Sequence, residues 1–152
     1  MKNTRPTVYV VTYCSGDKDP APGLLPAVDR YFSSRIRAAC EAASILETGF
    51  RILSGLYGLL EPDREIPDYD HLLTDDQVPG HARMLEQQLR ESAAETVIFI
   101  TRALAIDPGA GPYREAMSRA CTGAEVGFEV LEIGSPEPLS PELAALIRAL
   151  LG

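Results

Sequence analysis

The sequence has little with which to bind a long polyanion. Only two of its 152 residues are lysine, Lys2 and Lys18, and the formal net charge is −8. The arginines are scattered, apart from a group of three at Arg30, Arg35 and Arg37. Neutralising a nucleic-acid backbone requires clustered lysine and arginine side chains, so non-specific binding of duplex DNA is disfavoured. A small anionic ligand held by a few local cations remains compatible with this charge balance.

Several other features are also missing. No apolar run approaches the length of a membrane-spanning helix, and the first residues, Met1–Pro6, lack the apolar core of a signal peptide. The three cysteines, Cys14, Cys40 and Cys121, are odd in number and widely spaced, which indicates neither a disulfide framework nor a metal site. There is no internal repeat and no linker. We therefore expect one cytoplasmic domain over residues 1–152, without metal or cofactor, and the oligomeric state stays open.

Segments typical of strands and of helices alternate along the chain. β-Branched and apolar runs predict the strands, and apolar residues at helical spacing, such as Val28, Phe32, Ile36 and Ala39, predict the helices. The expected strands are 7–12, 50–54, 96–101 and 126–133, and the expected helices are 25–43, 79–93, 112–121 and 140–151. This order predicts an α/β domain, a three-layer, Rossmann-like sandwich with a mostly parallel, roughly four-stranded sheet.

Ligands of such sheets bind beyond the carboxyl ends of the strands. The loops expected at that edge are 13–24, 55–76, 102–111 and 134–139. Polar residue types gather in the first two of these loops, which follow strands that should be neighbours in a parallel sheet. We therefore predict that the segments 14–18 and 54–70 line one shared cleft.

The first of these loops begins with Cys-Ser-Gly-Asp-Lys at 14–18. The N–H groups of Ser15 and Gly16 could bind an anion, and Lys18 would supply the charge. Neither a P-loop nor a dinucleotide-binding fingerprint is present. The alternative is a solvated turn in which Lys18 pairs with a neighbouring aspartate; the scarcity of lysine favours a ligand. Cys14 is either a nucleophile with a lowered thiol pKa or a small residue packed beneath the loop, and we prefer packing because no histidine is near in sequence.

The second loop offers a hydroxyl, an aromatic ring and a carboxylate. Ser54 can bind a phosphate or carbonyl oxygen, or it can cap the turn. Tyr57 lies between Gly55 and Gly58, where a flat ligand could approach the backbone, although a core tyrosine is an equal alternative. Asp70, next to Tyr69 and expected to be buried against Leu72 and Leu73, is the best candidate for a general base or for a stabiliser of positive charge.

Two further cations could face the same edge. Tyr113 and Arg114 fall in the first turn of the third expected helix, where unpaired N–H groups favour anions, so Arg114 either clamps a phosphate or carboxylate or stays on the surface. Arg35 and Tyr31 lie one turn apart on the first expected helix. They either form part of the pocket wall or face solvent.

The second loop also carries a family resemblance. The segment 54–60 (Ser-Gly-Leu-Tyr-Gly-Leu-Leu), followed by Pro62 and by Pro-Asp-Tyr at 67–69, resembles the signature of the YaaA-like family, and 14–18 resembles the Cys-Ser-x-x-Lys start of its smaller members. This family includes domains of unassigned function and proteins associated with peroxide stress and DNA binding. The resemblance implies a YaaA-like domain and a stress-response role. The short, acidic chain lacks segments that could form a DNA-binding module, which puts DNA binding in doubt.

Two functions follow as hypotheses. The first is an enzyme, a hydrolase or transferase, that acts on a small anionic planar substrate such as a nucleotide, nucleoside or nucleobase derivative, by N-glycosidic cleavage, base exchange or base modification. The second is a YaaA-like stress protein that binds nucleic acid or a small ligand without catalysis. A pocket containing Lys18 and Asp70 would favour the first, and a basic surface stripe the second. The expected catalytic residues are Lys18, Tyr69 and Asp70, and the expected substrate-binding residues are Cys14, Ser15, Gly16, Arg35, Ser54, Gly55, Tyr57, Tyr113 and Arg114.

Overall fold

A five-stranded sheet forms the centre of the protein. The computed structural model describes residues 7–152, so the segment Met1–Pro6, on which the signal-peptide argument depends, lies outside the described residues. The strand order is β4-β3-β1-β6-β7. The parallel strands are β1 (Val8–Tyr13), β3 (Gly49–Ser54), β6 (Thr96–Arg102) and β7 (Gly127–Ile133), and β4 (Gly58–Leu60) is antiparallel to β3.

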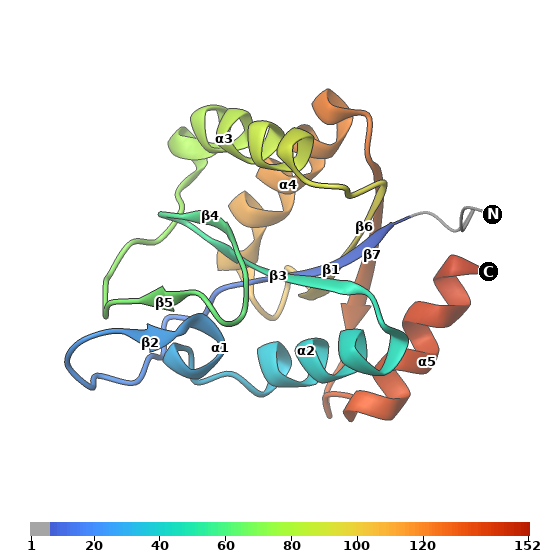
Figure 1. The fold of residues 1–152 in the computed structure, drawn as a ribbon, viewed down its shortest axis with the longest axis horizontal. Coiled ribbons are helices and arrows are strands. Elements are labelled where there is room, and N and C mark those ends of the chain that lie inside the picture. Colours follow the sequence, from blue (N-terminus) through green and yellow to red (C-terminus); the bar gives the residue numbers. More distant parts are fainter. Residues whose placement is uncertain (1–6) are drawn as a thin grey trace.

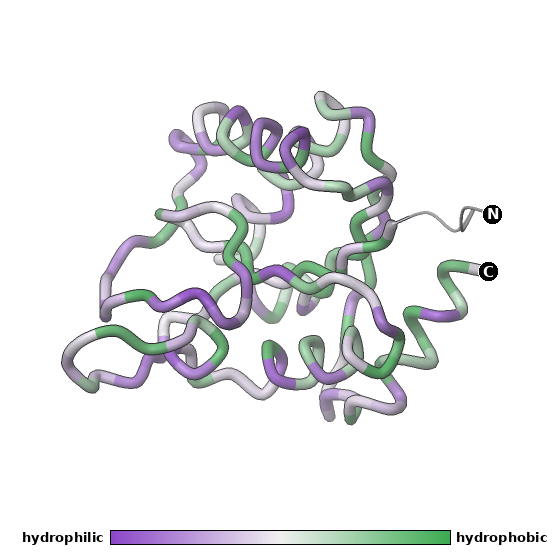
Figure 2. Tube along the Cα trace, viewed as in Figure 1, coloured by the Kyte–Doolittle hydropathy of each residue, from purple (hydrophilic) through white to green (hydrophobic). Residues whose placement is uncertain are grey.

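Helices cover both faces of this sheet (Figure 1). On one face lie α2 (Ser34–Leu46) and α5 (Ser140–Leu151), and on the other lie α3 (Val78–Glu91) and α4 (Gly111–Ala124). The central strands are therefore apolar on both sides, as parallel strands buried between helices require. Val10 and Val11 of β1 are fully buried and belong to the two different cores. Figure 2 shows this pattern as hydrophobic residues along the strands and mixed residues along the helices.

The expectation of a mixed α/β fold with a mostly parallel sheet is confirmed. The sheet has one strand more than expected, because β4 is only three residues long and too short to be recognised by its periodicity. A second, two-stranded sheet pairs β2 (Leu25–Pro26) with β5 (Glu65–Ile66). Short 3-10 turns, η1 (Asp75–Gln77) and η2 (Pro108–Ala110), precede α3 and α4. Within residues 7–152, no helix combines the length and the apolar character needed to cross a membrane.

The prediction of one continuous helix over 25–43 is wrong. The chain forms β2, then one turn of helix, α1 (Ala27–Arg30), and then leaves the helical conformation at Tyr31 and Ser33 before α2 begins. The Ser33 hydroxyl accepts the N–H of Ile36 at 3.2 Å and so starts a new helix. Phe32, expected on the buried face, is 51% exposed. The break brings the N-terminus of α2 to the carboxyl edge of the sheet.

One side chain closes the outer edge of β4. Leu59 donates its N–H to the Gln88 Oε1 at 2.8 Å, and the Gln88 Nε2 donates to the Tyr57 carbonyl at 3.1 Å. Gly58 has a φ of +73°, and a Cβ there would lie 2.4 Å from the Gln88 Oε1. A glycine at 58 therefore satisfies the turn and leaves room for the glutamine amide.

Candidate functional site

A cavity of about 310 Å³ opens at the carboxyl ends of β1 and β6. From β1 the chain continues to α2 on one face, and from β6 it continues to α4 on the other, so the cavity lies where the topology switches faces. Both loops singled out in the sequence reach it. Its lining residues are Tyr13 to Lys18, Phe32 to Arg35, Tyr69 to Leu72, Arg102, Asp107, Gly109 and Tyr113.

The loop after β1 forms one wall of the cavity, and we call 14–18 the first wall. The Phe32 N–H donates to the Asp17 carbonyl at 2.9 Å, which ties this loop to the break before α2. Among residues 7–152, the N–H groups of Ser15 and Gly16 find no acceptor. Adding a Cβ at Gly16 would meet nothing within 4 Å. The first wall therefore has open space and unused N–H groups.

Lys18 contributes a cation to the first wall. Its ammonium lies 4.9 Å from the centre of the Tyr69 ring and 5.9 Å from that of Tyr31, within the range of cation–π attraction. In the described part of the chain, no carboxylate forms a salt bridge with Lys18. Lys18 therefore does not pair with a neighbouring aspartate, which was the alternative.

The three clustered arginines have different environments. Arg30 is fully buried and donates to the backbone carbonyls of Asp19, Ala21, Gly23 and Ile66 at 2.6 to 3.2 Å, so it shapes the loop that precedes it. Arg37 is exposed. Only Arg35 lines the cavity.

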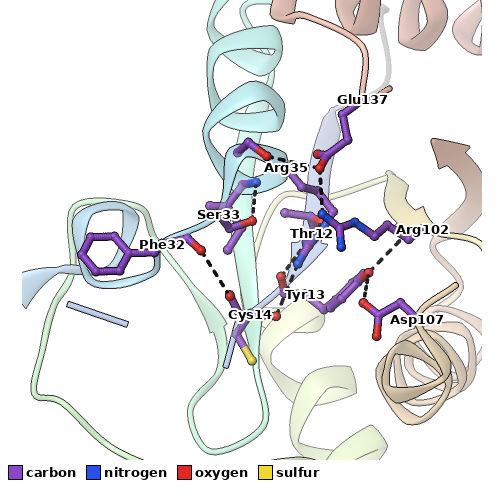
Figure 3. Close-up of polar contacts among 12 residues, drawn as sticks. Thr12, Tyr13, Cys14, Phe32, Ser33, Arg35, Arg102, Asp107 and Glu137 are labelled. Atoms are coloured by element: carbon purple, nitrogen blue, oxygen red, sulfur yellow. Dashed lines mark hydrogen bonds and ion pairs between the residues drawn. The ribbon is translucent and has the colours of Figure 1, made fainter. Parts of the chain in front are cut away.

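Arg35 is a buried cation at the start of α2. It is 4% exposed, donates to the Thr12 hydroxyl and, at 2.7 Å, to the Tyr13 carbonyl, and its guanidinium lies 3.7 Å from the centre of the Tyr13 ring (Figure 3). Burial lowers the pKa of Arg35, although a guanidinium keeps its charge in proteins. The first N–H groups of α2, at Ser34 and Arg35, have no partner within the helix. This end of the cavity is consequently rich in donors.

The lining residues that were not selected from the sequence include Tyr13, Arg102 and Asp107. The Tyr13 hydroxyl donates to the Asp107 Oδ2 at 2.8 Å, and Arg102 pairs with Glu137 at 2.7 Å (Figure 3). Tyr13 and Arg102 are the last residues of β1 and β6, and Asp107 follows in the loop after β6. The sequence could have indicated them, because they lie at or just after the ends of strands and the carboxyl edge of the sheet was predicted to bind the ligand.

The loop after β3 uses its hydroxyl groups internally. Ser54 is fully buried, and its Oγ accepts the N–H groups of Leu56 and Tyr57 at 3.1 Å each. The Tyr69 hydroxyl binds both the Ser54 Oγ, at 2.7 Å, and the Tyr31 hydroxyl. We call these three side chains the hydroxyl cluster. Burial raises the pKa of Tyr69 to about 12, so its phenol is neutral at physiological pH. Ser54 thus caps the turn, which was the structural alternative.

Gly55 and Tyr57 support the cavity without lining it. A Cβ at Gly55 would lie 2.9 Å from the His71 carbonyl and 3.0 Å from the Tyr113 hydroxyl, so the chain packs against this glycine. Tyr57 packs edge-on against Tyr69, with ring centres 5.2 Å apart. Tyr113 does line the cavity, where its hydroxyl accepts the Leu73 N–H at 3.1 Å. We call the segment 54–73 the second wall.

The expected burial of Asp70 is wrong, and Arg114 does not take up the position expected for a ligand-binding residue. Asp70 lines the cavity but is exposed, because Leu72, which should have covered it, is itself 64% exposed. Arg114 does not line the cavity. It pairs with Glu132 at 3.0 Å and links α4 to β7, so it corresponds to the surface alternative.

The cysteines are free thiols. Cys14 lines the cavity and is half-buried, with its Sγ 3.5 Å from the Tyr113 hydroxyl. Burial raises the pKa of Cys121 to about 12. Within residues 7–152, no group of three or more His, Cys, Asp or Glu side chains is arranged to hold a metal ion. No protein-family model matches the chain, and comparisons with curated proteins and with solved structures give no match either.

Proposed function

We propose that the protein is an enzyme that acts on a small anionic, planar molecule of the nucleotide, nucleoside or nucleobase class in this cavity. The observation that carries the proposal is the position of Lys18. Lys18 lines the cavity, and its ammonium has no carboxylate partner among the described residues; Ser15 and Gly16, whose N–H groups are unused, line the same cavity. Charge-assisted hydrogen bonds from such groups are the strong ones available to a phosphate or carboxylate.

Two further features support an anionic end of the ligand. The first N–H groups of α2 and the Arg35 guanidinium lie on the same lining as Lys18. A helix N-terminus favours negative charge. These donors therefore set the cavity apart from the rest of a chain whose net charge is −8.

A planar group would lie at the mouth of the cavity. Phe32 and Leu72 both line it and are 51% and 64% exposed, so they offer an apolar surface to a flat ring. Single exposed apolar side chains are common and need no functional explanation, but an aromatic ring beside a cavity lined by both basic and acidic side chains suits a nucleobase.

Asp70 supplies the carboxylate for bond chemistry in this proposal. Asp70 lines the same cavity, where it would stabilise positive charge on a sugar ring or activate a water molecule, as carboxylates do in glycosyl transfer. N-glycosidic cleavage or base exchange is the most concrete form of the reaction. Tyr69, whose hydroxyl already binds Ser54 and Tyr31, would position Lys18 through its ring.

Membership of the YaaA-like family, a three-layer Rossmann-like classification and a cytoplasmic location are parts of the same proposal. The segments 14–18 and 54–60 support the first, and helices on both faces of the sheet support the second. The combination of Lys18 and Asp70 in one cavity favours an enzyme over a non-catalytic binding protein.

The test is a thermal-shift screen of inorganic phosphate, sugar phosphates, nucleosides and nucleotides, followed by calorimetry. A ligand of the folded state raises the midpoint of unfolding by mass action. Lys18→Ala should weaken binding of the best phosphate-containing compound by about tenfold or more. Arg37→Ala, which removes the same charge from an exposed position outside the cavity, is the control and should bind as the wild type does.

Turnover is then measured on the compound that binds best. Asp70→Asn keeps the shape and removes the charge, so binding should survive while the single-turnover rate falls by about a hundredfold. An unchanged rate would remove Asp70 from the mechanism. Equal binding by wild type and Lys18→Ala would contradict the proposed function.

A further inference from the structure

Asp107 differs from Asp70 in how firmly it is held. Asp70 is exposed and accepts no hydrogen bond from the described residues. Asp107 is half-buried on the same lining, and its Oδ2 accepts the Tyr13 hydroxyl at 2.8 Å. Its other oxygen, Oδ1, has no donor within residues 7–152. A carboxylate with one oxygen fixed and one unused is oriented for an outside partner.

The direction of the hydrogen bond between Tyr13 and Asp107 follows from the surroundings of the phenol. The Arg102 N–H donates to the Tyr13 hydroxyl oxygen at 3.4 Å, so the phenol proton is directed to Asp107. Burial raises the pKa of Tyr13, which keeps that proton in place at neutral pH.

Tyr13 itself cannot swing away. The side chain is 4% exposed, and the Arg35 guanidinium covers one face of its ring, 3.7 Å from the ring centre. The ring centres of Phe99 and Tyr113 lie 6.2 and 6.0 Å from that of Tyr13. Arg35 is in turn fixed to the end of β1 by hydrogen bonds to Thr12 and to the Tyr13 carbonyl. Figure 3 shows this sequence of contacts from α2, through the end of β1, to Asp107.

We propose that Asp107 binds the ligand directly, by accepting a hydrogen bond from a ligand hydroxyl group through Oδ1, and that Tyr13 is its positioning residue. This inference rests on the proposed function and narrows its substrate class to hydroxyl-bearing anions, such as the sugar phosphate part of a nucleotide. A fixed carboxylate repels a bare anion, so an anion must bring a hydrogen-bond donor to gain from the Asp107 side.

Two probes separate the hydroxyl contact from the anion contact. Inorganic phosphate has the charge without sugar hydroxyls, and ribose 5-phosphate has the charge together with sugar hydroxyls. By calorimetry, wild type should bind ribose 5-phosphate more tightly than phosphate. Asp107→Asn should weaken binding of ribose 5-phosphate by about tenfold or more, because a neutral amide replaces the charged acceptor of the sugar hydroxyl, and should leave phosphate binding equal or slightly tighter. Asp63→Asn, an exposed aspartate outside the cavity, is the matched control.

Tyr13→Phe tests the positioning role. It removes the hydroxyl and keeps the ring against Arg35, so ribose 5-phosphate should bind several-fold more weakly while phosphate binding is unchanged. In an Asp107→Asn background the same change should have little further effect, because the carboxylate that Tyr13 orients is already gone. If the role of Tyr13 is purely structural, Tyr13→Phe should instead weaken the binding of both probes equally, in the wild-type and in the Asp107→Asn background.

The outcomes separate this inference from the proposed function. If ribose 5-phosphate and phosphate bind wild type equally, or if Asp107→Asn binds ribose 5-phosphate as wild type does, the inference is wrong and the anion site stands. If neither probe nor any nucleotide binds wild type, the proposed function fails and the inference fails with it.

Discussion

The two walls of the cavity contain the same kinds of residue and use them differently. The first wall (14–18) leaves the N–H groups of Ser15 and Gly16 unused and Lys18 without a carboxylate among the described residues. The second wall (54–73) uses the hydroxyl groups of Ser54 and Tyr69 internally and leaves only the Asp70 carboxylate exposed on the cavity lining. Residue type therefore does not identify a ligand contact at this edge. The better candidates are the polar groups whose hydrogen-bonding capacity remains unused after folding.

The largest expected effect comes from adding one methyl group to each wall. Gly55→Ala would bring a Cβ to within 3.0 Å of the backbone at His71 and Leu73, so it should lower the free energy of unfolding by about 3 kcal/mol. Gly16→Ala meets nothing within 4 Å and should cost less than about 0.5 kcal/mol. Urea unfolding of both variants measures the difference, and equal costs would remove the distinction between the walls.

Removing a hydroxyl group from each wall should give the next largest difference. Ser54→Ala leaves the part-buried N–H groups of Leu56 and Tyr57 and the Tyr69 hydroxyl without the Ser54 Oγ, at a cost of about 2 kcal/mol. Ser15→Ala loses contacts at an exposed site and should cost less than about 0.5 kcal/mol. Chemical denaturation of the pair is the measurement. A large effect of Ser15→Ala would mean that the first wall is structural as well.

Salt should distinguish Lys18 from Arg35, the buried cation that lines the same cavity. Because Lys18 is only part-buried, raising the salt concentration should weaken phosphate binding by about fivefold in the wild type, and much less in Lys18→Ala. Calorimetric titrations of phosphate at low and high salt give this comparison. Equal salt dependence in both proteins would assign the anion contact to another group, with Arg35 as the first candidate.

The smallest expected effect is a loss of folding stability at alkaline pH through Tyr69 of the second wall. The pKa of Tyr69 rises from 10.0 to about 12 on folding, so the folded state holds the proton that the unfolded state releases. The stability from Tyr69 is complete below pH 10.0 and is lost as the pH rises towards about 12. Between about pH 9 and pH 10.5, wild type should lose about 0.5 kcal/mol more than Tyr69→Phe does. Urea unfolding at the two pH values measures each decline, and equal declines would contradict the raised pKa.

The sequence was informative about the position of the site. Buried strands that end in Gly- and Pro-rich loops predicted the sheet edge, and the rarity of lysine drew attention to Lys18. It was not informative about contacts that depend on tertiary structure. Tyr13 and Asp107 lie 94 residues apart, and no local pattern links them. The exposure of Asp70 depends on where Leu72 points, and the break before α2 depends on the Ser33 cap overriding a continuous helical periodicity.

Gln88 has a consequence for how copies of this chain meet one another. An edge strand with free N–H and C=O groups is a template for strand addition, which leads to aggregation between molecules. The primary amide of Gln88 carries the same donor and acceptor as a peptide unit, and it occupies the outward-facing groups of Tyr57 and Leu59. One side chain from α3 thus takes the place of a further strand, and the sheet cannot extend into a neighbouring molecule at β4 without first displacing it.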